Sequence, residues 1–151
     1  MTELNAYEPA PYSEPSSVPA FGYELMREVL LPSILGKETS AILYWAGKDL
    51  ARKFPLQSLD EVVDFFGKAG WGSLTIKDEA KNELQAELSS TYISERLQKR
   101  NSLTNFQLEA GFLAQQIEGQ RNVVAECYEH PKKRSQKVVF TVKWDKKDPI
   151  E

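Results

Sequence analysis

The sequence predicts an α+β fold in which a four-stranded antiparallel sheet, built from two hairpins, carries helices on one face. Segments 71–88 and 123–144 alternate between apolar and polar residues with a period of two, which is typical of half-buried strands. Because each hairpin has one apolar and one largely polar face, helices should cover one side, with solvent or a partner on the other. A helical pattern precedes the second hairpin and places apolar residues at Leu108, Phe112, Leu113 and Ile117.

The chain has 151 residues, which suits one domain. Residues 1–20 hold four prolines among polar residues, and we expect a flexible arm there, ahead of a single α+β domain at 21–151. The N-terminus lacks the apolar core of a secretion signal, and no run approaches the roughly 18 apolar residues of a membrane span. The single cysteine, Cys127, excludes a disulfide within the chain and favours a cytoplasmic location. A net charge of −3 gives no overall attraction to nucleic acid or anionic membranes.

The first predicted helix spans about 21–35 and is apolar around most of its circumference. Such a helix is covered on more than one side, and in a small domain the second cover is expected to be another subunit. Pro32 should kink or end this helix, and Gly36 should cap it. The sequence therefore predicts a homodimer whose candidate interface is formed by Leu25, Met26, Val29 and Leu30.

The other predicted helices cover about 38–54, 59–67, 92–97 and 105–119. Gly47 lies inside the first of these, where glycine costs about 1 kcal/mol relative to alanine, so we expect another backbone to approach closely. Capping boxes are predicted at Ser58 with Glu61 and at Thr104 with Gln107.

The final hairpin can be placed in register by matching its apolar residues. The match puts Cys127 opposite Val138 and Ala125 opposite Phe140, which leaves residues 131–134 as the turn.

No constellation of catalytic residues is predicted. Cys127 and His130 lie three residues apart on one strand, so they point to opposite faces and cannot form a thiol–imidazole dyad. One histidine and one cysteine are too few for an ordinary zinc site. The glycine-rich segment 69–72 precedes a strand instead of following one, which argues against a phosphate-binding loop. We therefore expect no enzymatic activity, no metal and no cofactor.

Aromatic residues near the helices offer a candidate pocket for a small apolar ligand between the helices and the sheet. More often such residues fill the core, and this alternative is favoured, although the sequence leaves a cavity open. The candidate pocket residues are Trp45, Phe66, Trp71, Phe106 and Phe112.

Segment 131–147 is rich in basic residues and offers a patch for nucleic acid or another acidic partner, centred on Lys132, Lys133 and Arg134. Lysines on the outer face of a strand also protect it against edge pairing, and no aromatic stacking platform adjoins them. A solvated surface is therefore favoured, and nucleic acid is not expected as a partner.

Four segments of the chain, in order, resemble the YslB-like family of uncharacterised proteins of Gram-positive bacteria. The resemblance covers about 21–150 and implies no particular activity, because none is established for the family. The segments are YWAGKDLARKFPL (44–56), AGWGSLT (69–75), FQLEAGFLAQQI (106–117) and KVVFTVKWDKKDP (137–149).

A more distant likeness relates 109–144 to the 4-vinyl reductase-type ligand-binding domain and to the TRAPP vesicle-tethering subunits. A Gly-Phe-Leu-Ala helix at 111–114 runs into a hairpin with a late Phe140. This superfamily implies a four-stranded antiparallel sheet packed on helices, dimerisation through helices and, in some members, a long apolar cavity. Some members hold zinc through a Glu and several Cys near this hairpin. Here Glu126 and Cys127 are adjacent and there is no second Cys, so the resemblance does not extend to the metal.

The leading hypothesis from the sequence is a non-enzymatic homodimer that serves as an interaction or small apolar ligand-binding module. The alternative is a contact with nucleic acid or an acidic partner through the basic hairpin.

Overall fold

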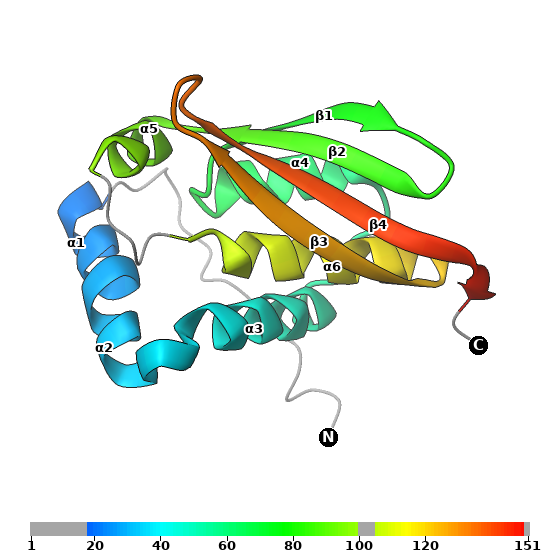
Figure 1. The fold of residues 1–151 in the computed structure, drawn as a ribbon, viewed down its shortest axis with the longest axis horizontal. Coiled ribbons are helices and arrows are strands. Elements are labelled where there is room, and N and C mark those ends of the chain that lie inside the picture. The colour runs from blue at the N-terminus through cyan, green and yellow to red at the C-terminus, as the bar shows by residue number, and fades with distance from the viewer. Residues whose placement is uncertain (1–17, 100–104, 150–151) are drawn as a thin grey trace, which may run out of the picture.

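The structure, a computed structural model, describes residues 18–99 and 105–149, with side chains up to Asp145. Its sheet has four antiparallel strands in the order β1-β2-β4-β3, with helices behind it in the view of Figure 1. The predicted fold class is therefore confirmed. The predicted arm falls almost entirely outside the described residues. Within the described residues, no helix is long and apolar enough to cross a membrane. The strands are β1 (Ser73–Glu79), β2 (Glu83–Ser89), β3 (Val123–Lys132) and β4 (Lys137–Pro149).

Two helices cover the apolar face of the sheet, and a third lies beside them. Helix α6 packs on β3 and β4, and α4 packs on β1, while α3 runs along α6 at the β3 edge (Figure 1). The short helix α5 follows β2. The bounds are α3 (Thr39–Lys53), α4 (Leu59–Lys68), α5 (Thr91–Gln98) and α6 (Gln107–Arg121).

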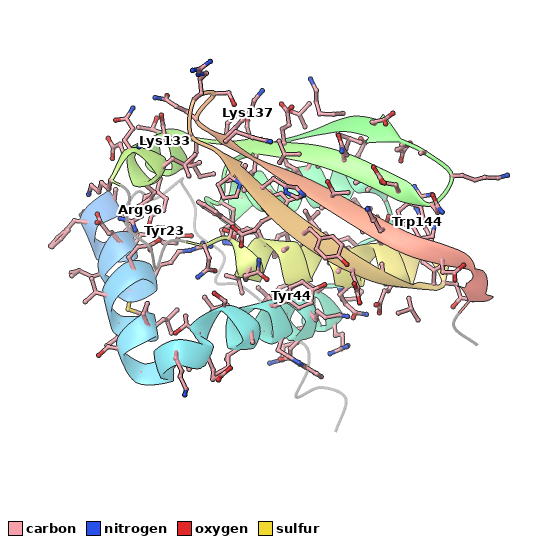
Figure 2. All side chains as sticks on the ribbon, viewed as in Figure 1. Tyr23, Tyr44, Arg96, Lys133, Lys137 and Trp144 are labelled. Atoms are coloured by element: carbon pink, nitrogen blue, oxygen red, sulfur yellow. The ribbon has the colours of Figure 1, made fainter. Side chains whose placement is uncertain are left out.

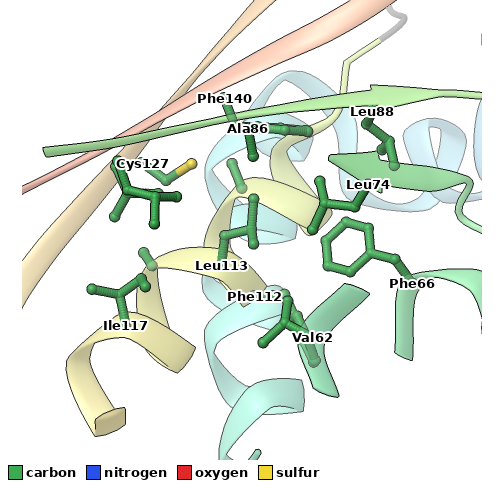
Figure 3. Packing of buried hydrophobic residues seen from close by; sticks show 14 of the residues in the cluster. Val62, Phe66, Leu74, Ala86, Leu88, Phe112, Leu113, Ile117, Cys127 and Phe140 are labelled. Atoms are coloured by element: carbon green, nitrogen blue, oxygen red, sulfur yellow. The ribbon is translucent and has the colours of Figure 1, made fainter. Parts of the chain in front are cut away.

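The core lies between the sheet and helices α4 and α6. Figure 3 shows Phe66 and Val62 of α4 and Phe112, Leu113 and Ile117 of α6 facing the apolar sides of the strands. The strand residues that meet them follow the predicted period of two, and they include Leu74, Ala86, Leu88, Cys127, Val138, Phe140 and Val142.

The predicted first helix is present, but three segments with different hydrogen bonding replace one regular helix. They are α1 (Ala20–Glu24), a π-helical stretch η2 (Leu25–Leu30) and α2 (Leu31–Leu35). A short 3₁₀ turn, η3 (Gly36–Glu38), follows. Proline lacks an amide hydrogen and crowds the carbonyl four residues earlier, and the wide turns of η2 lie just before Pro32. Gly36 ends the helix with a φ of +71°, as predicted.

The predicted register of the final hairpin is wrong by four residues. Cys127 pairs with Val142 and Ala125 with Trp144, and the turn consists of residues 133–136 instead of 131–134. A slip of an even number of residues keeps every side chain on its face, so the apolar pattern cannot distinguish the two registers. Pro131 is accommodated inside β3 because its missing N–H lies on the free edge of the sheet, where β4 requires no donor.

Two helix boundaries differ in how well they match the predicted caps. Ser58 caps α4 as predicted, because its side chain accepts a hydrogen bond from the Glu61 amide at 3.2 Å. Gly119 does not end α6, which continues to Arg121 and ends at Asn122 with a φ of +58°. Asparagine tolerates this left-handed conformation, and it therefore takes the role expected of glycine. Thr104 of the second predicted capping box lies outside the described residues.

Candidate functional site

Segments α1 and η2 bury the charged residues Arg27 and Glu28 and expose most of their large apolar residues. Arg27 is 8% exposed and donates to the Glu109 carboxylate of α6 at 2.5 Å and to the Tyr23 hydroxyl at 2.7 Å. Burial alone lowers the pKa of the Arg27 guanidinium, but the Glu109 carboxylate outweighs that effect and raises the pKa above its ordinary value. The pair links η2 directly to α6.

A second buried ion pair joins η2 to α5. Arg96 of α5 donates to Glu28 at 2.8 Å and to Glu24 at 3.2 Å, and the Tyr92 hydroxyl donates to Glu28 at 3.2 Å. Figure 2 shows Tyr23 and Arg96 close together where the first helices meet α5. Burial, followed by the nearby Glu28 carboxylate, raises the pKa of Tyr92 above its ordinary value, so the phenol stays protonated and able to donate.

The inward charges leave a row of large apolar side chains in solvent. All four predicted interface residues belong to it, and their exposed fractions range from 42% for Leu25 to 56% for Met26 and Val29. Large exposed apolar patches are unusual on monomers, so this row is a candidate interaction surface. We call this row the N-terminal apolar face, and it consists of Phe21, Leu25, Met26, Val29, Leu30 and Ile34.

A groove of 680 Å³ lies between α3 and the edge strand β3. The Tyr44 hydroxyl accepts a hydrogen bond from the Cys127 amide at 3.1 Å, and Glu118 accepts one from the Ala125 amide at 3.0 Å. Lys48 lies 3.3 Å from the same Glu118 carboxylate. We call this hollow the α3–β3 groove, and residues lining it include Ala41, Tyr44, Trp45, Val124, Cys127 and Glu129.

The five predicted pocket aromatics do not come together in one site. Trp45 is 67% exposed on α3, whereas the other four are buried in the core. Phe66, Trp71 and Phe112 pack edge to face on one another, with ring centroids 5.0–5.9 Å apart. Phe106 lies under the Arg27 guanidinium, 5.7 Å from it. These four rings fill space between the helices and the sheet, and only Trp45 lines the α3–β3 groove.

Cys127 and His130 lie on opposite faces of β3, as predicted. Cys127 is buried, and burial raises the pKa of its thiol well above the ordinary value, which makes it a poor nucleophile. His130 is exposed. Across the described ranges, no group of three or more histidine, cysteine, aspartate or glutamate side chains is placed to hold a metal ion.

The basic residues of the final hairpin lie around its turn. Lys132, Lys133 and Arg134 are exposed, and Figure 2 shows Lys133 at the tip. Lys137 instead contacts Glu87 of β2 at 2.9 Å, and this contact lowers the pKa of the Glu87 carboxyl. The side chains of Lys146 and Lys147 lie outside the described part of the chain.

The buried ion pairs and the side chains that cap the β3 edge are not predicted by the sequence patterns. One signal was present, since Arg27 and Glu28 interrupt an otherwise apolar helix. Their partners Glu109 and Arg96 are 82 and 68 residues away, and no local pattern links residues so far apart.

Comparison with solved structures supports the fold. A vinyl-4-reductase family protein from Methanocaldococcus jannaschii aligns with 22% identity over 87% of this chain and 85% of that chain, with a TM-score of 0.59. An Fe(II) unliganded H-NOX protein mutant from K. algicida aligns with 12% identity over 86% and 76%, with a TM-score of 0.52. A trafficking protein particle complex subunit 3 from Naegleria fowleri, covalently bound to palmitic acid, aligns with 11% identity over 87% and 92%, at 0.47. The support for the fold comes from the first two structures, and at 22% and 12% identity their likeness concerns the fold alone.

Sequence comparison is more specific. A family model described as "Protein of unknown function (DUF2507)" matches residues 20–143. The uncharacterized protein YslB of Bacillus subtilis (strain 168) is 54% identical over 131 residues, which is 87% of this chain and 88% of that protein. The predicted resemblance to YslB-like proteins is thus confirmed, and the chain belongs to the DUF2507 family of proteins of unknown function.

Proposed function

We propose that this protein is a non-enzymatic interaction module that acts as a homodimer through its N-terminal apolar face. The exposed side chains of that face, together with the inward ion pairs that hold them outward, carry the proposal. No catalytic group enters it, because the buried Cys127 thiol and the exposed His130 are kept apart.

The apolar surface of this face is large enough to offset the cost of a two-fold contact. Burying the remaining surface of each half-exposed apolar side chain contributes about 1 kcal/mol. In a two-fold interface each residue counts twice, so six side chains supply on the order of 12 kcal/mol, similar to the cost of association. Because the gain from apolar burial is close to the cost of association, one charge placed in the face should be enough to shift the protein from dimer to monomer.

Val29→Lys should convert the dimer to a monomer. The substitution removes an apolar contact from both subunits and brings two like charges together, so association should weaken at least about a hundredfold. Sedimentation equilibrium at micromolar concentration measures the change. Val124→Lys is the matched control, since Val124 and Val29 are both 56% exposed and Val124 lies on β3. A monomeric wild-type protein would refute the dimer, and a dimer that Val29→Lys leaves intact would refute this interface.

A second candidate function is binding of nucleic acid or another acidic partner through the exposed turn between β3 and β4. Changing Lys132, Lys133 and Arg134 to glutamate should then abolish binding to a DNA duplex. With about three phosphate contacts, log K for the wild type should fall with log salt at a slope of about −3. A filter-binding or fluorescence-anisotropy titration at several salt concentrations measures both effects.

The matched control changes Lys37, Lys77 and Lys81 to glutamate, which alters the net charge equally at exposed positions elsewhere. The idea fails if the wild type shows no salt-dependent binding, or if this control loses binding to the same extent.

A further inference from the structure

We propose that the α3–β3 groove is a binding site for an amphipathic organic amine, whose apolar body lies against Tyr44, Trp45 and Val124 and whose cationic head contacts Glu129. This site is separate from the N-terminal apolar face, and it does not depend on the proposed dimer.

Two contacts define the relative direction of α3 and β3 along the groove. The Tyr44 hydroxyl contacts the Cys127 amide, and one turn later Lys48 contacts Glu118, which also holds the Ala125 amide. Helix α3 and strand β3 are therefore antiparallel along the groove, and Figure 2 shows Tyr44 on α3 beside β3. Consequently the Lys48 end lies near the beginning of β3, and the opposite end lies near Glu129.

The walls suit an apolar ligand body. Trp45 and Val124 are large apolar side chains with more than half of their surface exposed, and both line the groove together with Ala41 and the Tyr44 ring. The volume of 680 Å³ falls in the range of about 300–1,000 Å³ that small-molecule sites occupy.

An added peptide strand is a poor occupant of this groove. Strand addition needs free amides along the edge of the sheet, but Tyr44 and Glu118 already accept from the edge amides of Cys127 and Ala125. The groove is therefore open to a compact ligand, while the edge is protected against pairing with another chain.

The charges in the groove favour a cation over an anion. Lys48 is already paired with Glu118, so it offers little to a carboxylate ligand. Glu129 is half-buried, and in the described part of the chain it accepts hydrogen bonds from two neutral groups, the Phe106 amide at 2.9 Å and the Gln107 side chain. No ion pair to Glu129 is formed within the described ranges, since Arg27 is engaged with Glu109. Burial raises the pKa of Glu129, and the hydrogen bonds from Gln107 and Phe106 and the nearby Arg27 charge offset that rise only in part.

Three probes with alkyl chains of similar length separate the head-group preference from the apolar contribution. Calorimetric titrations of the full chain with decylammonium, decan-1-ol and decanoate should show the amine binding about tenfold more tightly than the alcohol, because a charge-assisted hydrogen bond exceeds a neutral one. Decanoate should bind most weakly. The proposal is overturned if the wild type binds none of the probes or does not prefer the amine.

Variants then locate the site. Glu129→Gln keeps an acceptor for the Phe106 amide and should abolish the preference for the amine, whereas Glu95→Gln, at an exposed position on α5, should not change it. Trp45→Ala should weaken the binding of all three probes, and its exposed position poses little risk to folding. A preference for the amine that survives Glu129→Gln, or binding that Trp45→Ala does not affect, would place the ligand elsewhere and refute the site.

Discussion

Arg27→Ala should lower the free energy of unfolding by about 3–5 kcal/mol. The substitution leaves the Glu109 carboxylate, which is 1% exposed, without the guanidinium that lies 2.5 Å from it. A buried charge that loses its partner keeps its desolvation penalty and loses the attraction that offset it. Urea unfolding followed by circular dichroism measures the change as a lower midpoint at constant slope.

The control for Arg27→Ala is the loss of an ion pair that is exposed to solvent. Lys68 lies 3.2 Å from Asp64 on α4, and both side chains are mostly exposed, so Lys68→Ala should cost less than about 1 kcal/mol. A double variant, Arg27→Met with Glu109→Leu, should recover most of the loss, because apolar side chains of similar volume can replace a buried pair. A cost for Arg27→Ala as small as that for Lys68→Ala would show that the pair adds little to stability.

The Arg27 pair also has a consequence for the proposed interface. Without it, η2 can rotate and bring its apolar side chains toward α6, which would remove them from the surface. Arg27→Ala should therefore weaken dimerisation as well as stability, whereas Val29→Lys should weaken dimerisation alone. Comparing the two variants therefore distinguishes Arg27, which orients the N-terminal apolar face, from Val29, which lies in that face.

The first helix shows why the fold class could be predicted from the sequence while the orientation of this element could not. Period-two alternation in the hairpins and helical spacing before Gly119 depend on neighbours in sequence, and they correctly predicted the sheet and its covering helices. The apolar pattern of residues 21–35 indicated two covered sides, but the side that meets the protein is set by Arg27 and Glu28. Their partners are distant in sequence, and the apolar pattern contains no information about them.

The register of the final hairpin and the position of the groove could not be predicted from local patterns either. Apolar alternation fixed the face of each residue in β3 and β4 but not the register, because a four-residue slip leaves the pattern unchanged. The groove forms where α3 meets the edge of β3, and among the predicted pocket aromatics only Trp45 reaches it. The capping of the Cys127 amide by Tyr44 joins residues 83 positions apart, so it too lay beyond local patterns.

Gly47→Ala and Gly67→Ala should change stability in opposite directions. A Cβ on Gly47 would lie 2.1 Å from the Leu108 carbonyl oxygen of α6, so α3 and α6 would have to separate. This overpacking should cost about 3 kcal/mol, despite the better helix propensity of alanine. Nothing lies within 4 Å of a Cβ on Gly67 in α4, so alanine there should stabilise the protein by about 0.5 kcal/mol. Thermal or urea unfolding of both variants measures the sign. Equal effects would contradict the close approach predicted at Gly47.

Gly111 of α6, which faces α3 at the same crossing, allows a further test of the close approach. A Cβ on Gly111 would lie 2.0 Å from the Tyr44 carbonyl oxygen, so Gly47 and Gly111 both sit at the crossing of α3 and α6. Once one alanine has forced the helices apart, the second meets a contact that is already relieved, so the double variant should cost less than the sum of the single ones. The same separation would move Tyr44 away from the Cys127 amide, exposing the β3 edge and widening the groove. Loss of amide protection at Cys127 in hydrogen exchange should therefore accompany the loss of stability, whereas Gly67→Ala should leave that protection intact.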